Sequence, residues 1–210
     1  MVITKEETRS ERKKRRTRQA LIEATLAMIT EHGIGKFTVQ DVTEAADVAL
    51  ATAYNYFNSK EELISAAMET VMRQLAEKIE EATLTFPDPA LIFPYGLTTV
   101  LTVMAYDERF RWLHQRPEAL AQSIYHCFGP YAKGDIQKAV EAGRFHVNDL
   151  ETVWRQVSWS IVGIALGISQ DDLPQEVLKA AVINITMMLG VPPQEAADLF
   201  AKLPPPLDVS

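Results

Sequence analysis

Hydrophobic and polar positions recur with helical spacing along most of this chain. Apolar residues stand three or four positions apart between Leu21 and Ile29, and Gly33 follows them, so we expect a helix over about 10–32 that ends at this glycine. A second helix is expected over 59–81, with one apolar stripe formed by Ile64, Met68, Val71, Leu75 and Ile79. β-Branched residues form no alternating runs, so the pattern predicts an all-α protein.

Two short helices are expected between these long ones. Thr38 and Asp41 have the spacing of a capping box, which starts a helix. Asp47 stands where the turn needs a left-handed backbone, which aspartate tolerates better than most residues. A further helix from Ala49 to about Asn55 completes a helix-turn-helix, whose second helix commonly lies in the DNA major groove. The competing interpretation is a structural helical hairpin without a DNA role.

Proline, glycine and capping signals divide the rest of the chain into further helices. We expect these over 91–106, 107–116, 118–128, 135–142, 149–169, 174–190 and from 192 onward. The organisation predicted is a three-helix DNA-binding domain over 1–58 and a helical ligand-binding and dimerisation domain over 59–203. Residues 204–210 begin with three prolines, so we expect a disordered tail there.

The charge is distributed unevenly along the sequence. The net charge is −7, but residues 1–60 hold 10 Lys and Arg against 8 Asp and Glu, whereas residues 61–210 hold 11 against 20. Seven of the basic residues lie between Arg9 and Arg18, with only Glu11 opposing them. A basic run alone is usually a solvated face, but its place before a helix-turn-helix favours contact with DNA, and we assign Arg16 and Arg18 to that contact.

Several other classes of protein find little support in the sequence. The single cysteine, Cys127, excludes an internal disulfide and a multi-cysteine zinc site, and it fits a reducing cytosol. His114, His126 and Cys127 are an alternative set of metal ligands, but no pair has the i,i+4 spacing, so we expect neither metal nor cofactor. No signal peptide is recognisable, and we expect a cytoplasmic protein that does not span a membrane. A small helical enzyme is a further alternative that no nucleophile–base pair or phosphate loop supports.

The first third of the chain resembles the TetR (tetracycline repressor) family of bacterial transcription regulators. The residues in family register are Arg18, Ala24, Gly33, Thr38, Val39, Ala45, Ala46, Val48, Tyr54, Tyr56, Phe57 and the run Ser59–Leu63. The resemblance implies a homodimeric regulator, most often a repressor, that binds a palindromic double-stranded DNA operator and responds to a small-molecule effector. The alternative within this class is a DNA-binding dimer without an inducer.

The resemblance also implies roles for individual residues. The Thr38 hydroxyl and the Val39 amide would hold one phosphate at a helix N-terminus. The side chains of Tyr54, Tyr56 and Lys60 would hold the flanking phosphates. The positions nearest the base edges would be Leu50, Ala51, Thr52 and Asn55.

The sequence departs from the family pattern at the recognition helix. Asp47 and Ala51 stand where glycine is usual, Ala49 where serine is usual, and Leu50 where a polar or basic residue is frequent. The leucine side chain cannot hydrogen-bond a base. Our hypothesis is that Leu50 contacts thymine methyl groups, while the Arg9–Arg18 run supplies much of the affinity.

Aromatic residues and methionines are frequent in the C-terminal half. Because the family usually carries an effector pocket there, we expect an apolar or aromatic ligand, although each residue taken singly is also explained as core. The predicted lining is Met104, Phe110, Trp112, Tyr125, His126 and Trp154. A solidly packed C-terminal half without a ligand is the alternative.

The helices expected over 151–169 and 175–189 are apolar around most of their circumference. A monomer surface does not need this, so we expect a two-fold dimer built as a four-helix bundle, with Gly163 and Gly167 allowing close approach. Burial within one chain is the alternative. The predicted interface residues are Val157, Ile161, Ala165, Ile168, Val182, Ile185 and Met188.

Overall fold

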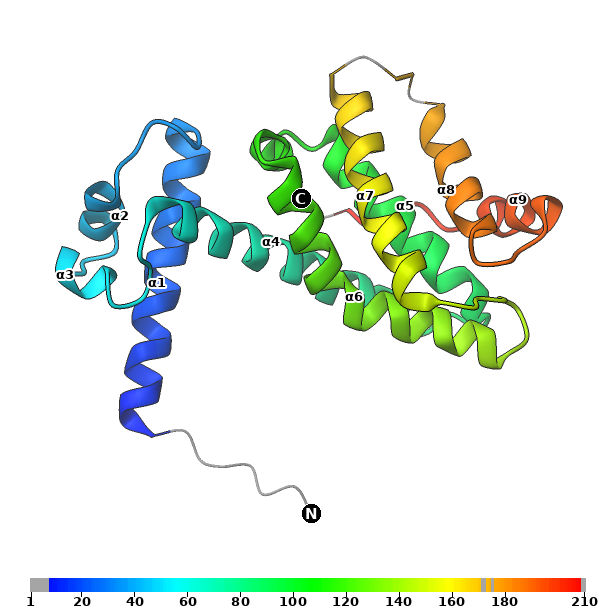
Figure 1. Ribbon diagram of the computed structural model, residues 1–210, viewed down its shortest axis with the longest axis horizontal. Coiled ribbons are helices and arrows are strands. Elements are labelled where there is room, and N and C mark those ends of the chain that lie inside the picture. Colours follow the sequence, from blue (N-terminus) through cyan, green and yellow to red (C-terminus); the bar gives the residue numbers. More distant parts are fainter. Residues whose placement is uncertain (1–7, 171–172, 175, 209–210) are drawn as a thin grey trace. The chain divides into compact units, whose positions relative to one another are not determined.

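The computed structural model describes residues 8–170, 173–174 and 176–208, and every regular element among them is helical (Figure 1). The prediction of an all-α protein is confirmed. The chain forms two compact units that divide between Thr70 and Val71. This division lies inside α4 (Lys60–Thr83), whereas we expected it before that helix. The first turns of α4 belong to the N-terminal unit because Leu63 and Ile64 are fully buried there.

The N-terminal unit consists of α1 (Arg9–His32), α2 (Val39–Ala45), α3 (Leu50–Ala53) and the start of α4. Thr8 caps α1, and its backbone N–H donates to the Glu11 carboxylate at 2.8 Å. The helix ends at Gly33, as predicted, where φ is +83°. A small core fills the unit and contains Leu21, Ile22, Ile29, Phe37, Val42, Ala53 and Phe57.

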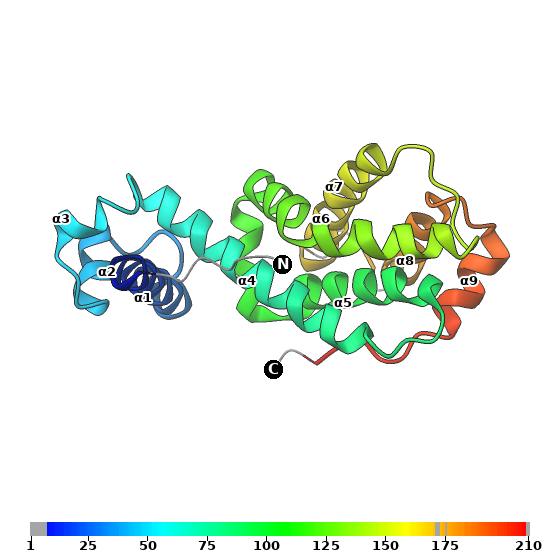
Figure 2. The same cartoon turned by 90° about the horizontal axis from the view of Figure 1, so that it is seen from below.

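The C-terminal unit is organised around α5 (Ile92–Tyr106), which contacts α6, α7, α8 and α9 (Figure 2). Its other elements are the 3₁₀ helices η1 (Pro89–Leu91) and η2 (Glu108–Gln115), and the helices α6 (Pro117–Glu141), α7 (Leu150–Ser169), α8 (Val177–Met187) and α9 (Pro193–Ala201). Because α5 has neighbours on several sides, most of its residues are buried and apolar.

Among the described residues, one helical segment, Pro89–Tyr106, is long enough and apolar enough to cross a membrane, judged by length and composition alone. The sequence interpretation overlooked it. The stretch is 61% buried inside the protein, because α5 is the central helix of the C-terminal unit. A core helix explains its composition.

The structure corrects the prediction of two helices over 118–128 and 135–142. They are one helix, α6, with Pro130 in its interior. Packing against α7 accounts for the continuity: the Trp154 indole N–H donates to the Tyr125 carbonyl at 3.0 Å. Gly129 fits against the same indole, since a Cβ there would lie 2.9 Å from Trp154 Nε1. Tertiary contacts thus outweigh the cost of a helix-interior proline.

Two further contacts join distant segments of the C-terminal unit. The Arg144 guanidinium donates to the carboxylates of Asp88 and Glu195, which connects the α6–α7 loop to η1 and α9. The Leu207 N–H donates to Thr99 Oγ1 at 3.3 Å. Residues 203–208 have no regular secondary structure, and this hydrogen bond attaches Leu207 to α5, so the disordered tail stays a prediction.

Candidate functional site

The helix-turn-helix begins at a capping box formed by Thr38 and Asp41, as predicted. Thr38 Oγ1 accepts from the Asp41 N–H at 3.2 Å, and the Asp41 carboxylate accepts from the Thr38 N–H at 2.7 Å. Hydrogen bonds from the Thr38 backbone and hydroxyl lower the pKa of Asp41. The N-terminus of α2 is therefore fixed by its own side chains.

The turn between α2 and α3 follows the sequence expectation at Asp47, where φ is +52°. Ala49 precedes α3 without a side-chain capping bond, as its missing hydroxyl predicts. The helix itself is shorter than the expected 49–55 and spans Leu50–Ala53. The backbone then turns, because the Phe57 N–H donates to the Ala53 carbonyl at 3.0 Å and the Phe57 ring enters the core.

The residues proposed from sequence to touch DNA all reach the surface of the N-terminal unit. Leu50 is 39% exposed and Tyr54 is 49% exposed, whereas Ala53 between them is buried and anchors the helix. The full set has exposed or half-buried side chains and comprises Arg16, Arg18, Thr38, Val39, Leu50, Ala51, Thr52, Tyr54, Asn55, Tyr56 and Lys60.

Two of these cations are held by contacts that the sequence did not reveal. The Lys60 ammonium donates to the Phe37 carbonyl and lies 4.1 Å from the centroid of the Phe37 ring. Because Phe37 directly precedes Thr38, this charge is placed beside the start of α2. The Arg18 guanidinium lies 5.2 Å from the Phe57 ring centroid. Stacking of this kind restrains a long cation without neutralising it.

The basic run is the first part of α1. The helix begins at Arg9, and its buried residues begin only at Leu21. Every basic side chain between Arg9 and Arg18 is exposed. The run is therefore a positively charged helical segment that precedes the packed part of α1.

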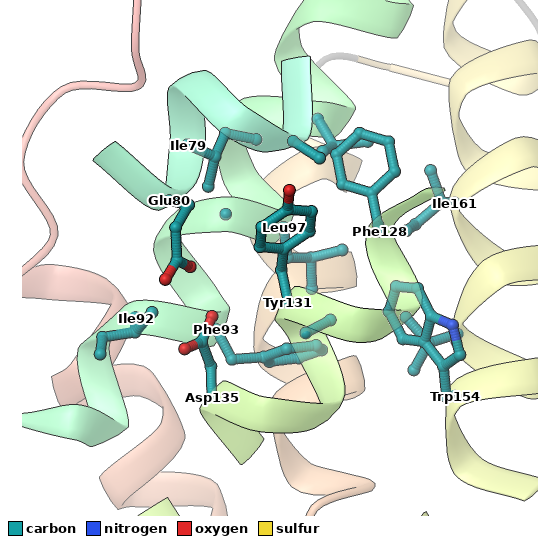
Figure 3. A pocket seen from close by; sticks show the side chains of 15 residues that line it. Ile79, Glu80, Ile92, Phe93, Leu97, Phe128, Tyr131, Asp135, Trp154 and Ile161 are labelled. Atoms are coloured by element: carbon teal, nitrogen blue, oxygen red, sulfur yellow. The ribbon is translucent and has the colours of Figure 1, made fainter. Parts of the chain in front are cut away.

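A cavity that is partly open to solvent lies in the C-terminal unit between α4, α5, α6 and α7 (Figure 3). Its walls are mainly apolar, and its described lining is Ala76, Ile79, Glu80, Ile92, Phe93, Gly96, Leu97, Val100, Phe128, Tyr131, Ala132, Asp135, Trp154, Val157 and Ile161.

The lining corrects the sequence prediction, from which only Trp154 is present. Met104 is buried beside a smaller hollow, and His126 is exposed on α6. The cavity faces a different stripe of α6, formed by Phe128, Tyr131, Ala132 and Asp135. The remaining predicted residues, Phe110, Trp112 and Tyr125, are half-buried elsewhere.

The sequence led us to expect that the helix over 59–81 connects the pocket to the DNA-binding unit, but none of its residues was predicted to line the cavity. Ala76, Ile79 and Glu80 come from this helix, although the sequence placed Ile79 only on an apolar stripe. The stripe predicted that this side of α4 is buried, but it could not show which helices face it, because that depends on tertiary packing.

The predicted dimer interface is corrected as well. Six of its seven residues are buried within the single chain, because that side of α7 and α8 packs against α5 and α6: Val157, Ile161, Ala165, Ile168, Val182 and Ile185. Met188 is 38% exposed. The other side of α7 and α8 carries Trp159, which is 47% exposed, and Met187, which is 36% exposed.

The two glycines of α7 also differ. Apart from its chain neighbours and the nearby backbone of α7, no described atom lies within 4 Å of the place where a Cβ of Gly163 would be. At Gly167 a Cβ would lie 2.5 Å from Leu173, so that glycine is covered by its own chain. Of the two, Gly163 is the one with room for a second molecule.

Comparison with known families decides the identity of this arrangement. Residues 21–67 match the model of bacterial regulatory proteins of the tetR family. Residues 88–202, more than half of the chain, match the tetracyclin repressor-like C-terminal domain. The chain belongs to the TetR family. The N-terminal unit is thus the DNA-binding part of a transcriptional regulator, and the alternative of a small helical enzyme is wrong.

Individual TetR-type relatives are more distant. The chain is 33% identical to the transcriptional regulator LuxR of Vibrio harveyi over 64 residues, which are 30% of this chain and 31% of LuxR. It is 34% identical to the transcriptional repressor KstR of Mycolicibacterium smegmatis over 83 residues, 40% of each protein. The matches therefore span less than half the length of both regulators.

A solved structure of RolR in complex with the ligand resorcinol has a similar fold. Its TM-score is 0.79 at 22% identity, and the match covers 95% of this chain and 99% of RolR. At this identity the likeness concerns the fold.

Proposed function

We propose that this TetR-family protein is a transcriptional repressor that leaves a palindromic operator when a small, largely apolar molecule fills the cavity. The observation that carries the proposal is the course of α4. Its first residue, Lys60, belongs to the DNA-binding unit, and its residues Ala76, Ile79 and Glu80 line the cavity. A ligand that shifts this wall therefore acts on the helix that also carries a proposed phosphate contact. By linkage, ligand and DNA then weaken the binding of each other.

The proposed DNA contacts follow the exposed surface of the N-terminal unit. Thr38 and the Val39 amide bind one phosphate with Lys60 beside them, and Tyr54 and Tyr56 bind its neighbours. Arg16 and Arg18 add salt-dependent affinity from α1. The base edges are left to Leu50, Ala51, Thr52 and Asn55, which are exposed or half-buried around α3.

The proposed homodimer uses the exposed apolar side of α7 and α8. Trp159, Met187 and Met188 are large and exposed, and the open backbone at Gly163 lets a second helix approach closely. Two copies related by a two-fold axis would present their recognition helices about one turn of DNA apart, or a multiple of it, which is why the operator is expected to be palindromic.

The effector is proposed to be small and at least partly aromatic. Phe93, Phe128, Tyr131 and Trp154 give the cavity aromatic walls. RolR, which shares the fold, has been solved with resorcinol, a small aromatic molecule. Resorcinol is therefore a reasonable first probe for this chain.

The proposal is tested with the full chain and DNA selected from the genome that encodes it. We expect salt-sensitive binding to a palindromic fragment, measured by fluorescence anisotropy, and release of that fragment by at least one compound in a metabolite panel. Filling the cavity with Ala132→Phe should abolish the release without abolishing DNA binding. A DNA complex that no compound affects, together with no change in melting temperature, would support a DNA-binding dimer without an effector.

A further inference from the structure

One side of the cavity carries two carboxylates. The other polar side-chain groups of its described lining are the Tyr131 hydroxyl and the Trp154 indole N–H, which donates to the Tyr125 carbonyl. Glu80 from α4 and Asp135 from α6 direct their carboxylates toward one another at this side, whereas Phe93, Leu97 and Phe128 form apolar walls (Figure 3). The Tyr131 ring crosses the cavity between them. A ligand in this space therefore meets hydrogen-bond acceptors in one direction and hydrocarbon in most others.

The side of the cavity that carries Glu80 and Asp135 has a negative net charge. Among the described lining residues of the cavity, none is Lys or Arg. Lys138 pairs with Asp135 at 2.9 Å, but its side chain is 57% exposed and reaches Asp135 from outside the cavity. Two carboxylates against one ammonium leave a net charge of about −1, which a bound molecule would face in a site of low polarity.

A second hollow lies next to the cavity and shows where the carboxylates of Glu80 and Asp135 are placed. Its lining shares Glu80, Ile92 and Asp135 with the cavity and adds Lys138 and Phe86. The two carboxylates therefore lie between the apolar cavity and this outer hollow. A molecule that entered from the outer hollow would pass them, leave its apolar part inside and keep its polar part beside them.

We propose that the effector carries an apolar ring and a hydrogen-bond donor, either a hydroxyl or a protonated amine, that binds Glu80 and Asp135. This rests on the proposed function, because it names the ligand of the same cavity. A donor facing a carboxylate forms a charge-assisted hydrogen bond. An anionic group in that place would leave three negative charges near a single ammonium, and the site therefore selects against carboxylate and phosphate ligands.

Four probes of similar shape separate the contributions of the apolar ring, the hydrogen-bond donor and the charge to binding. They are benzylamine, benzyl alcohol, toluene and benzoate, each titrated into the full chain by calorimetry. We expect benzylamine to bind most tightly and benzyl alcohol next, each at least about tenfold better than benzoate, since a charge-assisted hydrogen bond exceeds the 1.4 kcal/mol of a tenfold change. The order of the first two shows whether the amine or the hydroxyl is the better donor.

The variant Glu80→Gln keeps the size of the side chain and removes its charge. It should weaken benzylamine about tenfold and strengthen benzoate, because it relieves the repulsion. Glu81→Gln is the matched control: Glu81 is the next residue of α4, is exposed and does not line the cavity. It should leave all four titrations unchanged.

The outcomes separate this inference from the proposed function. If toluene or benzoate binds best, or if Glu80→Gln changes nothing, the inference is wrong; loss of that binding in Ala132→Phe would still leave the proposed effector site standing. If none of the four binds, the inference is likewise overturned. The proposed ligand response fails only if the DNA complex is also insensitive to the whole metabolite panel.

Discussion

The two units of this protein differ in how far their sequence determines their surface. In the N-terminal unit, short-range signals such as the Thr38–Asp41 capping box and the left-handed Asp47 fix which side chains face outward. In the C-terminal unit, α7 has apolar residues on two sides, so helical periodicity alone does not identify the buried side. Packing against α5 and α6 decides which side is buried. Local geometry thus positions the proposed DNA contacts, whereas long-range contacts shape the cavity.

The strongest way to test this contrast is to block the exposed side of α7. We expect Gly163→Arg to prevent dimerisation and to reduce operator affinity by about thirtyfold or more, because a hot spot of an interface contributes about 2 kcal/mol or above, and every 1.4 kcal/mol is about tenfold. Analytical ultracentrifugation and anisotropy measure the two effects.

Gly134→Arg provides the control for that variant. Gly134 is an exposed helix-interior glycine of α6. Apart from its chain neighbours and the nearby backbone of α6, no described atom lies within 4 Å of the place where its Cβ would be. It should remain dimeric. If Gly163→Arg also remains dimeric, the interface lies elsewhere.

In the N-terminal unit, the largest single effect is expected at Lys60. Lys60→Ala should weaken binding about tenfold for every operator sequence alike and reduce the salt slope by about 1, as loss of one phosphate contact does. Lys78→Ala, an exposed lysine in the later part of α4, is the control and should change neither quantity. A change in sequence preference for Lys60→Ala would contradict a phosphate role.

The long-range contacts of the C-terminal unit are tested at Arg144. Arg144→Met should lower the free energy of unfolding by about 1–2 kcal/mol, a figure reduced for the 32% exposure of the Arg144 side chain. Urea unfolding monitors the effect. Arg109→Met is the control, because the Arg109–Asp107 pair lies at the surface and its loss should leave stability close to that of the wild type.

The same contact predicts a pH dependence. Burial tends to raise the pKa of Asp88, but hydrogen bonds from Arg144 and from the Ala90 amide outweigh it, and the pKa lies below its ordinary value. The stabilisation is therefore present above the unfolded pKa and is lost as the pH falls through the folded one, below about pH 4. The difference in stability between the wild type and Arg144→Met should shrink over that interval; a difference independent of pH would exclude the ion pair as its cause.

The smallest effect is expected at the base edges. Leu50→Ala should reduce the preference for thymine at one operator position severalfold while changing total affinity little, because it removes an apolar contact with a methyl group. Selection of bound fragments from a random pool measures the preference. An unchanged selected site would show that Leu50 does not read thymine.

The sequence predicted the helix-turn-helix more accurately than the rest because its signals lie within a few residues of one another. Gly33, Thr38 and Asp47 have the predicted conformations. It could not predict that α6 continues through Pro130, since the stabilising Trp154 is far away along the chain. For the same reason it placed Tyr125 and His126 in the cavity instead of Tyr131 and Asp135.

Pro130 has a consequence for the cavity wall. It has no N–H to donate to the His126 carbonyl one turn earlier, so α6 lacks that hydrogen bond next to Phe128 and Tyr131, both of which line the cavity. Bending a helix costs least where a rung is missing. The wall formed by Phe128 and Tyr131 therefore borders the place where α6 bends most easily.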